Sequence, residues 1–214
     1  MASANRLRKT LPLAEVKGLV WMLAGLPSAH LLWAAINNTL GANPIEKLTH
    51  VTGYWALTLL IMTLAITPLR KLSGWPWLMQ LRRMLGLWAF FYACLHVLTY
   101  LILDQFFDWA AIYKDIVKRP YITVGFLAFL LLIPLAVTSS SAMIKRIGGK
   151  RWRHLHRLVY VVAVAGVVHY SWLVKKDLSK PLIFATVLAL LFAVRLFYWL
   201  RQNGPANKQR GQIS

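Results

Sequence analysis

Charged residues, and acidic ones above all, are scarce in this chain. Of its 214 residues only 14% are charged and only 6 are Asp or Glu, whereas a soluble domain carries roughly 25% charged residues. Hydrophobic residues make up 58% of the sequence. These proportions argue against a soluble globular fold. They predict an all-α integral membrane protein of several spans, with too little polar sequence for a second, soluble domain.

Cysteine and nucleotide-binding motifs are nearly or wholly absent. The single cysteine, Cys94, excludes an internal disulfide, a CxxC redox pair and a thiolate metal cage, and its apolar surroundings are typical of a small core residue. The sequence contains neither a GxGxxG fingerprint nor a phosphate-binding loop. Because the segment 201–214 is also too short for a nicotinamide or flavin domain, we expect no such domain here.

Basic residues are abundant and give a net charge of +19. They flank the apolar stretches and do not form a surface interleaved with aromatic side chains. Basic clusters placed in this way determine membrane topology and do not make a phosphate-binding surface. Nucleic acid is therefore not an expected partner.

Apolar stretches of about 20 residues recur along the chain, and this is the length that a helix needs to cross a bilayer. Spans in lipid must be helical here, because an isolated strand cannot satisfy its backbone there. The sequence therefore predicts a bundle of six transmembrane helices. The predicted spans are residues 17–36, 52–69, 82–103, 121–138, 156–174 and 181–200.

The basic residues also predict the orientation of these spans. Of the 25 Lys and Arg residues, 17 fall on one side of the predicted bundle and seven on the other, where five of the six acidic residues also lie. The positive-inside rule places both termini, about 1–16 and 201–214, in the cytoplasm. The basic N-terminus resembles a signal sequence, but its apolar run is close to a full span, so we expect a retained first helix.

Two histidines, His96 and His169, lie inside apolar segments at matching depth. Each follows a residue at the cytoplasmic boundary, Arg83 or His156, by 13 positions. At a rise of 1.5 Å per residue, both lie roughly 20 Å from that boundary. Imidazoles deep in hydrocarbon are costly and indicate function. Two of them on parallel helices favour axial ligation of one haem iron between the third and fifth spans.

Other interpretations of this pair stay open. One is a pair of structural imidazoles bonded to the backbone or to hydroxyl groups, for which Thr99 and Ser171 are candidate partners. Zinc is less suitable, since it needs three or four ligands and no Asp or Glu lies in the middle of a span. Two imidazoles alone suit haem, because the porphyrin supplies the other four ligands.

A second, inner level is incomplete. His156 lies at the cytoplasmic boundary in a basic stretch, where a solvated side chain is the alternative to a ligand of a second haem. At the same level the third span carries Arg83, and a guanidinium is a poor iron ligand because it stays protonated. Near the inner face, Arg82, Arg83 and Arg195 are candidates for binding cofactor carboxylates or quinone. At the outer boundary, His50 is a candidate for contacting a haem propionate or a quinone.

Short motifs distributed over most of the chain together resemble one known family. They are Leu-Gly-Ala-Asn-Pro at 40–44, His50 with Thr52-Gly53, Ile66-Thr67-Pro68-Leu69, Arg82-Arg83 with Leu85-Gly86-Leu87-Trp88, His96, Arg119-Pro120-Tyr121, Lys150-Arg151-Trp152, Leu155-His156, Tyr160 and His169-Tyr170. The chain is similar to the haem-binding membrane subunits of periplasmic methionine sulfoxide reductase systems, the MsrQ (YedZ) family of the ferric-reductase-like transmembrane superfamily.

This resemblance implies a single transmembrane domain over residues 1–214 that holds haem b through His96 and His169, with His156 at a second haem site. It implies electrons drawn from the quinone pool, FMN in some members, and a periplasmic molybdopterin-containing partner that reduces methionine sulfoxide in oxidised proteins. It also implies a multi-pass protein of the bacterial inner membrane that transfers electrons and is not catalytic alone. Superfamily relatives commonly carry two histidines on each ligand helix, and here Arg83 stands in place of the fourth.

Two other functions are alternatives to this one. A self-contained ferric or oxygen reductase would need an internal path from a cytoplasmic nicotinamide, for which no binding segment is found in the sequence. A haem-free transporter or structural membrane protein would place His96 and His169 against different neighbours.

Overall fold

The computed structural model describes residues 13–174 and 177–203, and every regular element in this part of the chain is a helix. The predicted all-α fold is therefore confirmed. Most of the two predicted tails, and all of their basic residues except Arg201, lie outside the described residues.

Six helices correspond to the six predicted spans. They are α2 (Leu13–Ile36), α3 (Pro44–Ser73), α4 (Met79–Leu98), α6 (Pro120–Val137), α9 (Leu158–Leu173) and α10 (Ser179–Asn203). By length and composition, five helical segments are able to cross a membrane, and α9 is not among them. It has 16 residues and is therefore roughly 24 Å long at 1.5 Å per residue, shorter than a ~30 Å hydrocarbon core. The count of six crossings stays a prediction.

Most of these helices extend beyond the predicted spans, because polar residues can continue a helix into the membrane interface. Helix α3 begins at Pro44, eight positions before the predicted span. The Asn43 side chain caps it by accepting a hydrogen bond from the Glu46 amide, and proline is favoured in the first turn of a helix. Helix α4 follows a short 3-10 turn, η1 (Pro76–Leu78), and continues into a π-helical turn, η2 (Thr99–Asp104).

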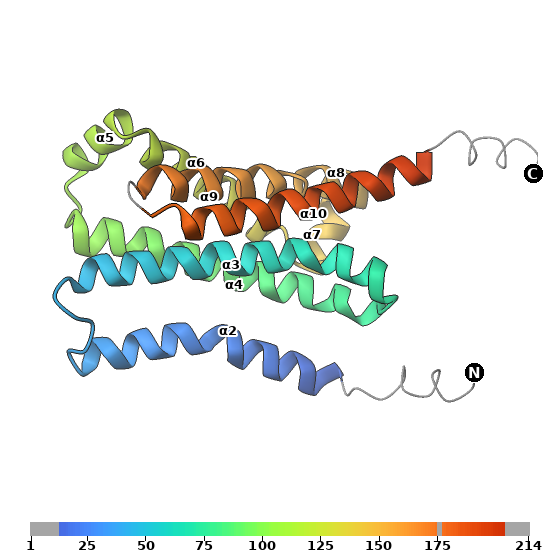
Figure 1. Ribbon diagram of the computed structural model, residues 1–214, viewed down its shortest axis with the longest axis horizontal. Helices are drawn as coiled ribbons and strands as arrows, with labels where there is room; N and C mark the ends of the chain where they lie inside the picture. The colour runs from blue at the N-terminus through green and yellow to red at the C-terminus, as the bar shows by residue number, and fades with distance from the viewer. Residues whose placement is uncertain (1–12, 175–176, 204–214) are drawn as a thin grey trace, which may run out of the picture.

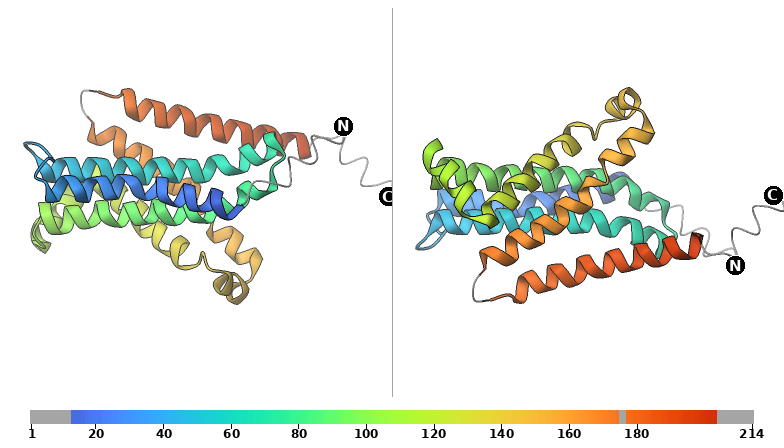
Figure 2. Two further views of the ribbon diagram at one scale, coloured as in Figure 1. Left: turned by 90° about the horizontal axis from the view of Figure 1, so that it is seen from below. Right: turned by 90° about the horizontal axis from the view of Figure 1, so that it is seen from above.

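Three short helices in the connections were not predicted: α5 (Trp109–Lys118), α7 (Ser141–Ile147) and α8 (Gly149–Leu155). None is long enough to give the hydropathy signal of a span. Local residues explain two of them, since the side chains of Asp108 and Ser140 cap α5 and α7. Figure 2 shows α7 and α8 projecting away from the other helices.

Four helices form a ring at the centre of the molecule. Helix α3 packs on α4 and α9, and α6 packs on the same two helices, so α4 and α9 stand at opposite corners. Helix α10 packs against α3 and α9, and α2 packs against α3 and α4 (Figure 1). The ring matters for function because α4 carries His96 and α9 carries His169.

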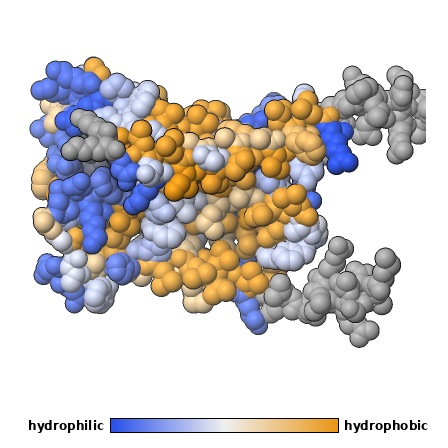
Figure 3. All heavy atoms as spheres, viewed as in Figure 1, coloured by the Kyte–Doolittle hydropathy of each residue, from blue (hydrophilic) through white to orange (hydrophobic). Residues whose placement is uncertain are grey.

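The two ends of the bundle are polar and its middle is apolar. Figure 3 shows a hydrophobic band over the long helices, with hydrophilic residues gathered at the end where α5 lies. Both described chain ends, Leu13 and Asn203, lie at the opposite end (Figure 1). The described ends of α2 and α10 thus lie on one side of the bundle. That this side is the cytoplasmic one stays a prediction.

Helix α2 lies at the edge of the bundle and bends along its length (Figure 1). Pro27 lies inside this helix, and proline disturbs the helical hydrogen-bond ladder. Next to it, the hydroxyl of the fully buried Tyr92 donates to the Ala24 carbonyl at 2.8 Å and accepts from the Ser28 amide at 2.9 Å. An undisturbed helix would pair these two groups with each other. From the neighbouring helix α4, the Tyr92 hydroxyl therefore provides hydrogen-bond partners for these two backbone groups of α2.

Replacing Tyr92 with phenylalanine is expected to weaken the contact between α2 and α4. The change removes only the hydroxyl and leaves two backbone groups short of a partner in an apolar setting, at a cost of about 1–2 kcal/mol. Thermal unfolding of the purified protein measures this loss. Tyr113→Phe is the matched control, because Tyr113 is exposed on α5. Equal stability of the two variants would contradict the proposed role of the hydroxyl.

A second proline, Pro68, lies inside α3. Since proline has no backbone N–H, it cannot donate to the carbonyl of Leu64, four positions earlier. The guanidinium of Arg195 on α10 donates to that carbonyl and, at 3.3 Å, to the Leu191 carbonyl of its own helix. It also lies 5.3 Å from the centre of the Tyr160 ring. The arginine thus finds partners inside the bundle and joins α10 to α3.

Candidate functional site

A cavity of about 310 Å³ opens near the end of the bundle where α5 lies, and its walls are largely apolar. All four helices of the central ring line it, and so does α5. Both His96 and His169 contribute to its wall. Because α4 and α9 occupy opposite corners of the ring, the two imidazoles approach the cavity from different sides.

The two imidazole rings lie close together. Their centres are 6.0 Å apart and their planes are inclined by 82°. A bond between a metal and an imidazole nitrogen is roughly 2 Å long, so two imidazoles on opposite sides of one ion have ring centres about 6 Å apart. The separation therefore fits one metal ion between the rings.

Hydrogen bonds fix the chemical form of both rings. The Nδ1 atom of His96 lies 2.9 Å from the carbonyl oxygen of Thr49 on α3, and that of His169 lies 2.7 Å from the carbonyl of Tyr121 on α6. A carbonyl can only accept, so each Nδ1 carries a proton and a neutral ring keeps its lone pair on Nε2. Within the described residues neither Nε2 has a hydrogen-bond partner. This arrangement prepares Nε2 to bind a metal.

The backbone bonds that the structural interpretation of the two histidines allows are present, but the hydroxyl partners named for it are not. Thr99 donates to the Leu95 carbonyl and Ser171 to the Val167 carbonyl, each at 2.8 Å. Both hydroxyls therefore bond back to their own helix, as Ser and Thr do in apolar helices. No group of three or more His, Cys, Asp or Glu side chains suited to a metal ion occurs in residues 13–174 and 177–203. A donor set of two imidazoles fits haem and not a zinc site.

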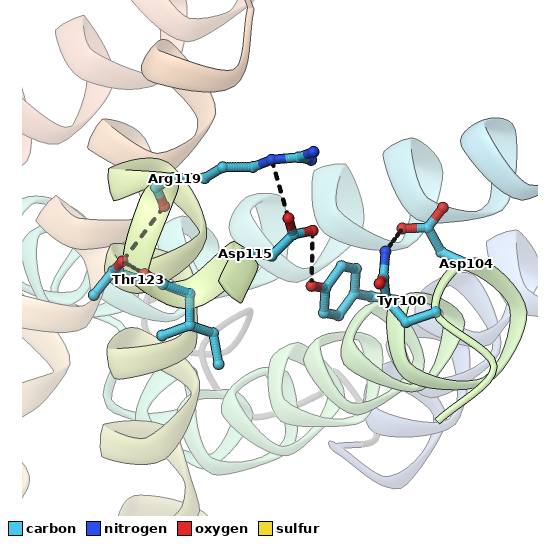
Figure 4. A network of polar contacts seen from close by, with 7 residues as sticks. Tyr100, Asp104, Asp115, Arg119 and Thr123 are labelled. Carbon is cyan, nitrogen blue, oxygen red and sulfur yellow. Dashed lines mark hydrogen bonds and ion pairs between the residues drawn. The ribbon is translucent and has the colours of Figure 1, made fainter. Parts of the chain in front are cut away.

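Polar groups gather at the mouth of this cavity, which His50, Asp104 and Arg119 help to line. Figure 4 shows how Asp115 of α5 joins two of its neighbours. It forms an ion pair with Arg119 at 3.2 Å and accepts a hydrogen bond from the Tyr100 hydroxyl at 3.3 Å. These contacts hold α5 beside the cavity and place the Asp115–Arg119 ion pair at its wall. The contribution of Arg119 was missed because it was treated only as a family motif.

A second cavity of about 300 Å³ lies nearer the other end of the ring. Three of the predicted site residues, Arg82, Arg83 and His156, line it together. Leu60 and Leu132 line both cavities, so a shared apolar wall separates them. The structure thus gathers three of the four inner candidates at one place and the outer candidates at another.

The inner histidine is held differently from the outer pair. The Nε2 atom of His156 lies 3.1 Å from the Thr138 hydroxyl, which donates its own proton to the Pro134 carbonyl. That hydroxyl must therefore accept a proton from Nε2. The ring also stacks on Trp152, with centres 4.1 Å apart. Ligation of iron through Nε2 would require His156 to leave Thr138, whereas His96 and His169 need no such change.

Arg195 is the one predicted site residue that lines neither cavity. Through its contacts with Leu64, Leu191 and Tyr160, Arg195 links α10 to neighbouring helices. A role for it in cofactor binding stays a prediction. The two backbone acceptors of the outer site, Thr49 and Tyr121, were missed. The sequence signal that could have identified them is a glycine four positions after each residue. Both residues lie near the start of their helix, and the two helices start at the same end of the bundle.

The fold and site define a class: a helical membrane protein with two imidazoles opposed across a cavity in a four-helix ring. Comparison with known proteins narrows it. The family described as ferric reductase like transmembrane component matches residues 52–167. A protein from Herminiimonas arsenicoxydans, named protein-methionine-sulfoxide reductase heme-binding subunit MsrQ, is 54% identical to this chain. The alignment covers 93% of this chain and 92% of the relative. The relative of the same name from Rhodospirillum rubrum is 62% identical over 78% of this chain and 81% of its own length.

The chain therefore belongs to the MsrQ family of ferric-reductase-like transmembrane proteins, as its sequence motifs predict. A third relative with the same name, from Azospira oryzae, is 57% identical over 90% of this chain and 83% of its own length. The family match, residues 52–167, contains His96 and His156 and ends just before His169.

Proposed function

We propose that this protein binds haem b between His96 and His169 and passes electrons to a methionine sulfoxide reductase. The observation that carries the proposal is the pair of imidazoles with ring centres 6.0 Å apart and both Nδ1 atoms bonded to carbonyls. The relatives named as heme-binding subunits of that reductase support the same cofactor and partner. When bound, haem iron supplies reversible one-electron chemistry.

The chain's own residues would hold and insulate the cofactor. His96 and His169 offer Nε2 to the iron, and their carbonyl partners raise the basicity of both rings. The apolar walls exclude water, and charged groups on the porphyrin edge would find Arg119 and His50 at the mouth. The inner cavity, with Arg82 and Arg83, is proposed to receive electrons from quinol or to hold a second haem beside His156.

The finer parts of the proposal concern membrane position and partners. We propose that α9 makes a sixth crossing of the bacterial inner membrane, with both termini in the cytoplasm and the His96–His169 cavity toward the periplasm. Electrons would then leave near the mouth of this cavity, where α5 lies, for a periplasmic molybdopterin-containing subunit that repairs oxidised proteins. FMN, which the family resemblance implies for some members, is a further candidate cofactor. The whole chain would serve as one transmembrane domain without catalysis of its own.

The full-length protein, expressed with ample haem and purified in detergent, tests this proposal. We expect a Soret band, a low-spin haem spectrum, reduction of the haem by a short-chain quinol, and reoxidation by the partner reductase with methionine sulfoxide. Absence of bound haem would overturn the proposal. Reduction by NADH without quinol would instead favour the self-contained reductase. The ratio of haem to protein, measured again in His156→Ala, reports whether the inner cavity holds a second haem.

A further inference from the structure

The hydrogen bonds that hold His96 and His169 share a detail that their family motifs do not explain. Each carbonyl acceptor is followed four positions later by glycine: Thr49 by Gly53 on α3, and Tyr121 by Gly125 on α6. The two helices and the two histidines belong to different corners of the ring. The same local device thus occurs twice around one cavity.

Helix geometry explains why the fourth residue matters. A helical carbonyl accepts from the amide four positions later, and its second lone pair can receive another donor. Side chains on a helix tilt toward its N-terminus, so a side chain at that fourth position lies beside the carbonyl. Only glycine leaves this approach open to an imidazole.

The distances show how little room exists. A methyl group at Gly53 would lie 3.0 Å from both Nδ1 and Cε1 of His96. One at Gly125 would lie 2.6 Å from Nδ1 and 2.8 Å from Cε1 of His169. Alanine at Gly125 therefore forces the ring to move, while alanine at Gly53 requires a smaller shift.

Other glycines in the spans do not have this relation to a histidine. Gly18 has no atom within 4 Å of an added methyl group, and Gly25 meets only the outer edge of the Trp88 ring at 3.2 Å. Both lie on α2, outside both cavities. Both positions are therefore controls for a glycine-to-alanine substitution in a membrane helix. Gly18 tests the change in open space, and Gly25 tests it in a tightly packed place.

We propose that Gly53 and Gly125 are positioning residues that let the two backbone carbonyls set the orientation and basicity of the ligand imidazoles. The inference rests on the proposed binding of haem by His96 and His169. The carbonyls hold the two ring planes at 82° to each other. The electron paramagnetic resonance signal of a bound haem iron would depend on this angle. A ring displaced from its carbonyl donates less electron density to the iron, which favours the reduced state and raises the midpoint potential.

The test compares Gly53→Ala and Gly125→Ala with Gly18→Ala and Gly25→Ala in the full-length purified protein. Haem content, the low-spin electron paramagnetic resonance signal and the midpoint potential are measured for each. We expect Gly125→Ala to weaken haem binding on the order of ten- to hundredfold, as loss of a ligand's hydrogen-bond partner does elsewhere. Gly53→Ala should retain more haem, with an altered resonance signal and a higher potential. Both controls should match the unsubstituted protein.

The outcomes separate this inference from the proposed function. Unsubstituted protein without haem overturns the proposed function. Unsubstituted protein with haem, together with unchanged signals in Gly53→Ala and Gly125→Ala, overturns only the role of the glycines. Equal effects in Gly25→Ala would overturn it too, because a general packing defect would then suffice. Should Gly125→Ala fail to fold, the smaller contact at Gly53 still allows the comparison of signal and potential.

Discussion

Replacing His96 or His169 with alanine is expected to abolish the low-spin haem spectrum. Each substitution removes one of the two proposed ligands, and the other His and acidic side chains of the cavity wall, His50 and Asp104, lie at its mouth. The remaining histidine alone would leave the iron with an open position and much weaker binding. Optical spectroscopy of the purified variants, with haem content per protein, measures the effect.

The chain supplies a matched control for this experiment. His30 lies on α2, is exposed at the surface of the bundle and lines neither cavity, so His30→Ala should keep the full spectrum. His169→Met gives a sharper comparison, since a thioether can also bind haem iron and His/Met ligation raises the reduction potential. Retained haem with a higher potential in that variant would identify His169 as a direct ligand. An unchanged spectrum in His96→Ala or His169→Ala would refute the assignment.

Replacing Arg195 with methionine is expected to destabilise the bundle without removing haem. The change keeps a long side chain but leaves the Leu64 carbonyl, which Pro68 has deprived of its amide partner, without a donor. Hydrogen bonds from charged groups are worth about 1.5–3 kcal/mol. Unfolding measurements in detergent, with Arg201→Met at the exposed end of α10 as control, report the loss.

A double-mutant cycle with Pro68→Ala tests the cause. Alanine at position 68 restores an amide that can donate to the Leu64 carbonyl, so Arg195→Met should cost clearly less stability in that background. Equal losses in both backgrounds would show that Arg195 acts in another way. Loss of quinol oxidation in Arg195→Met with unchanged stability would support the cofactor role predicted from the sequence.

The sequence predicted the histidine pair well because a helix has a constant rise. Counting residues from the basic boundary was enough to find His96 and His169 at one level, and the structure brings their rings together. Counting residues along a helix could not identify the carbonyls that accept hydrogen bonds from the two rings. They lie 47 and 48 positions away in the chain, on other helices, and backbone carbonyls leave no trace in residue type.

The inner residues show a different limit of sequence reasoning. An intramembrane arginine indicates function by default, and so Arg195 was grouped with Arg82 and Arg83. Only the last two line the inner cavity. The proline that accounts for Arg195 lies on another helix, so the link depends on the packing of α3 against α10. The short helix α5 was missed for a simpler reason, because hydropathy over about 20 residues averages out a helix of 10.

The ring of four helices consists of two antiparallel hairpins, α3 with α4 and α6 with α9, and each supplies one histidine together with the carbonyl that orients it. Each hairpin can therefore prepare its half of the site before it meets the other. Haem bound between His96 and His169, as proposed above, would therefore also link the two hairpins to each other.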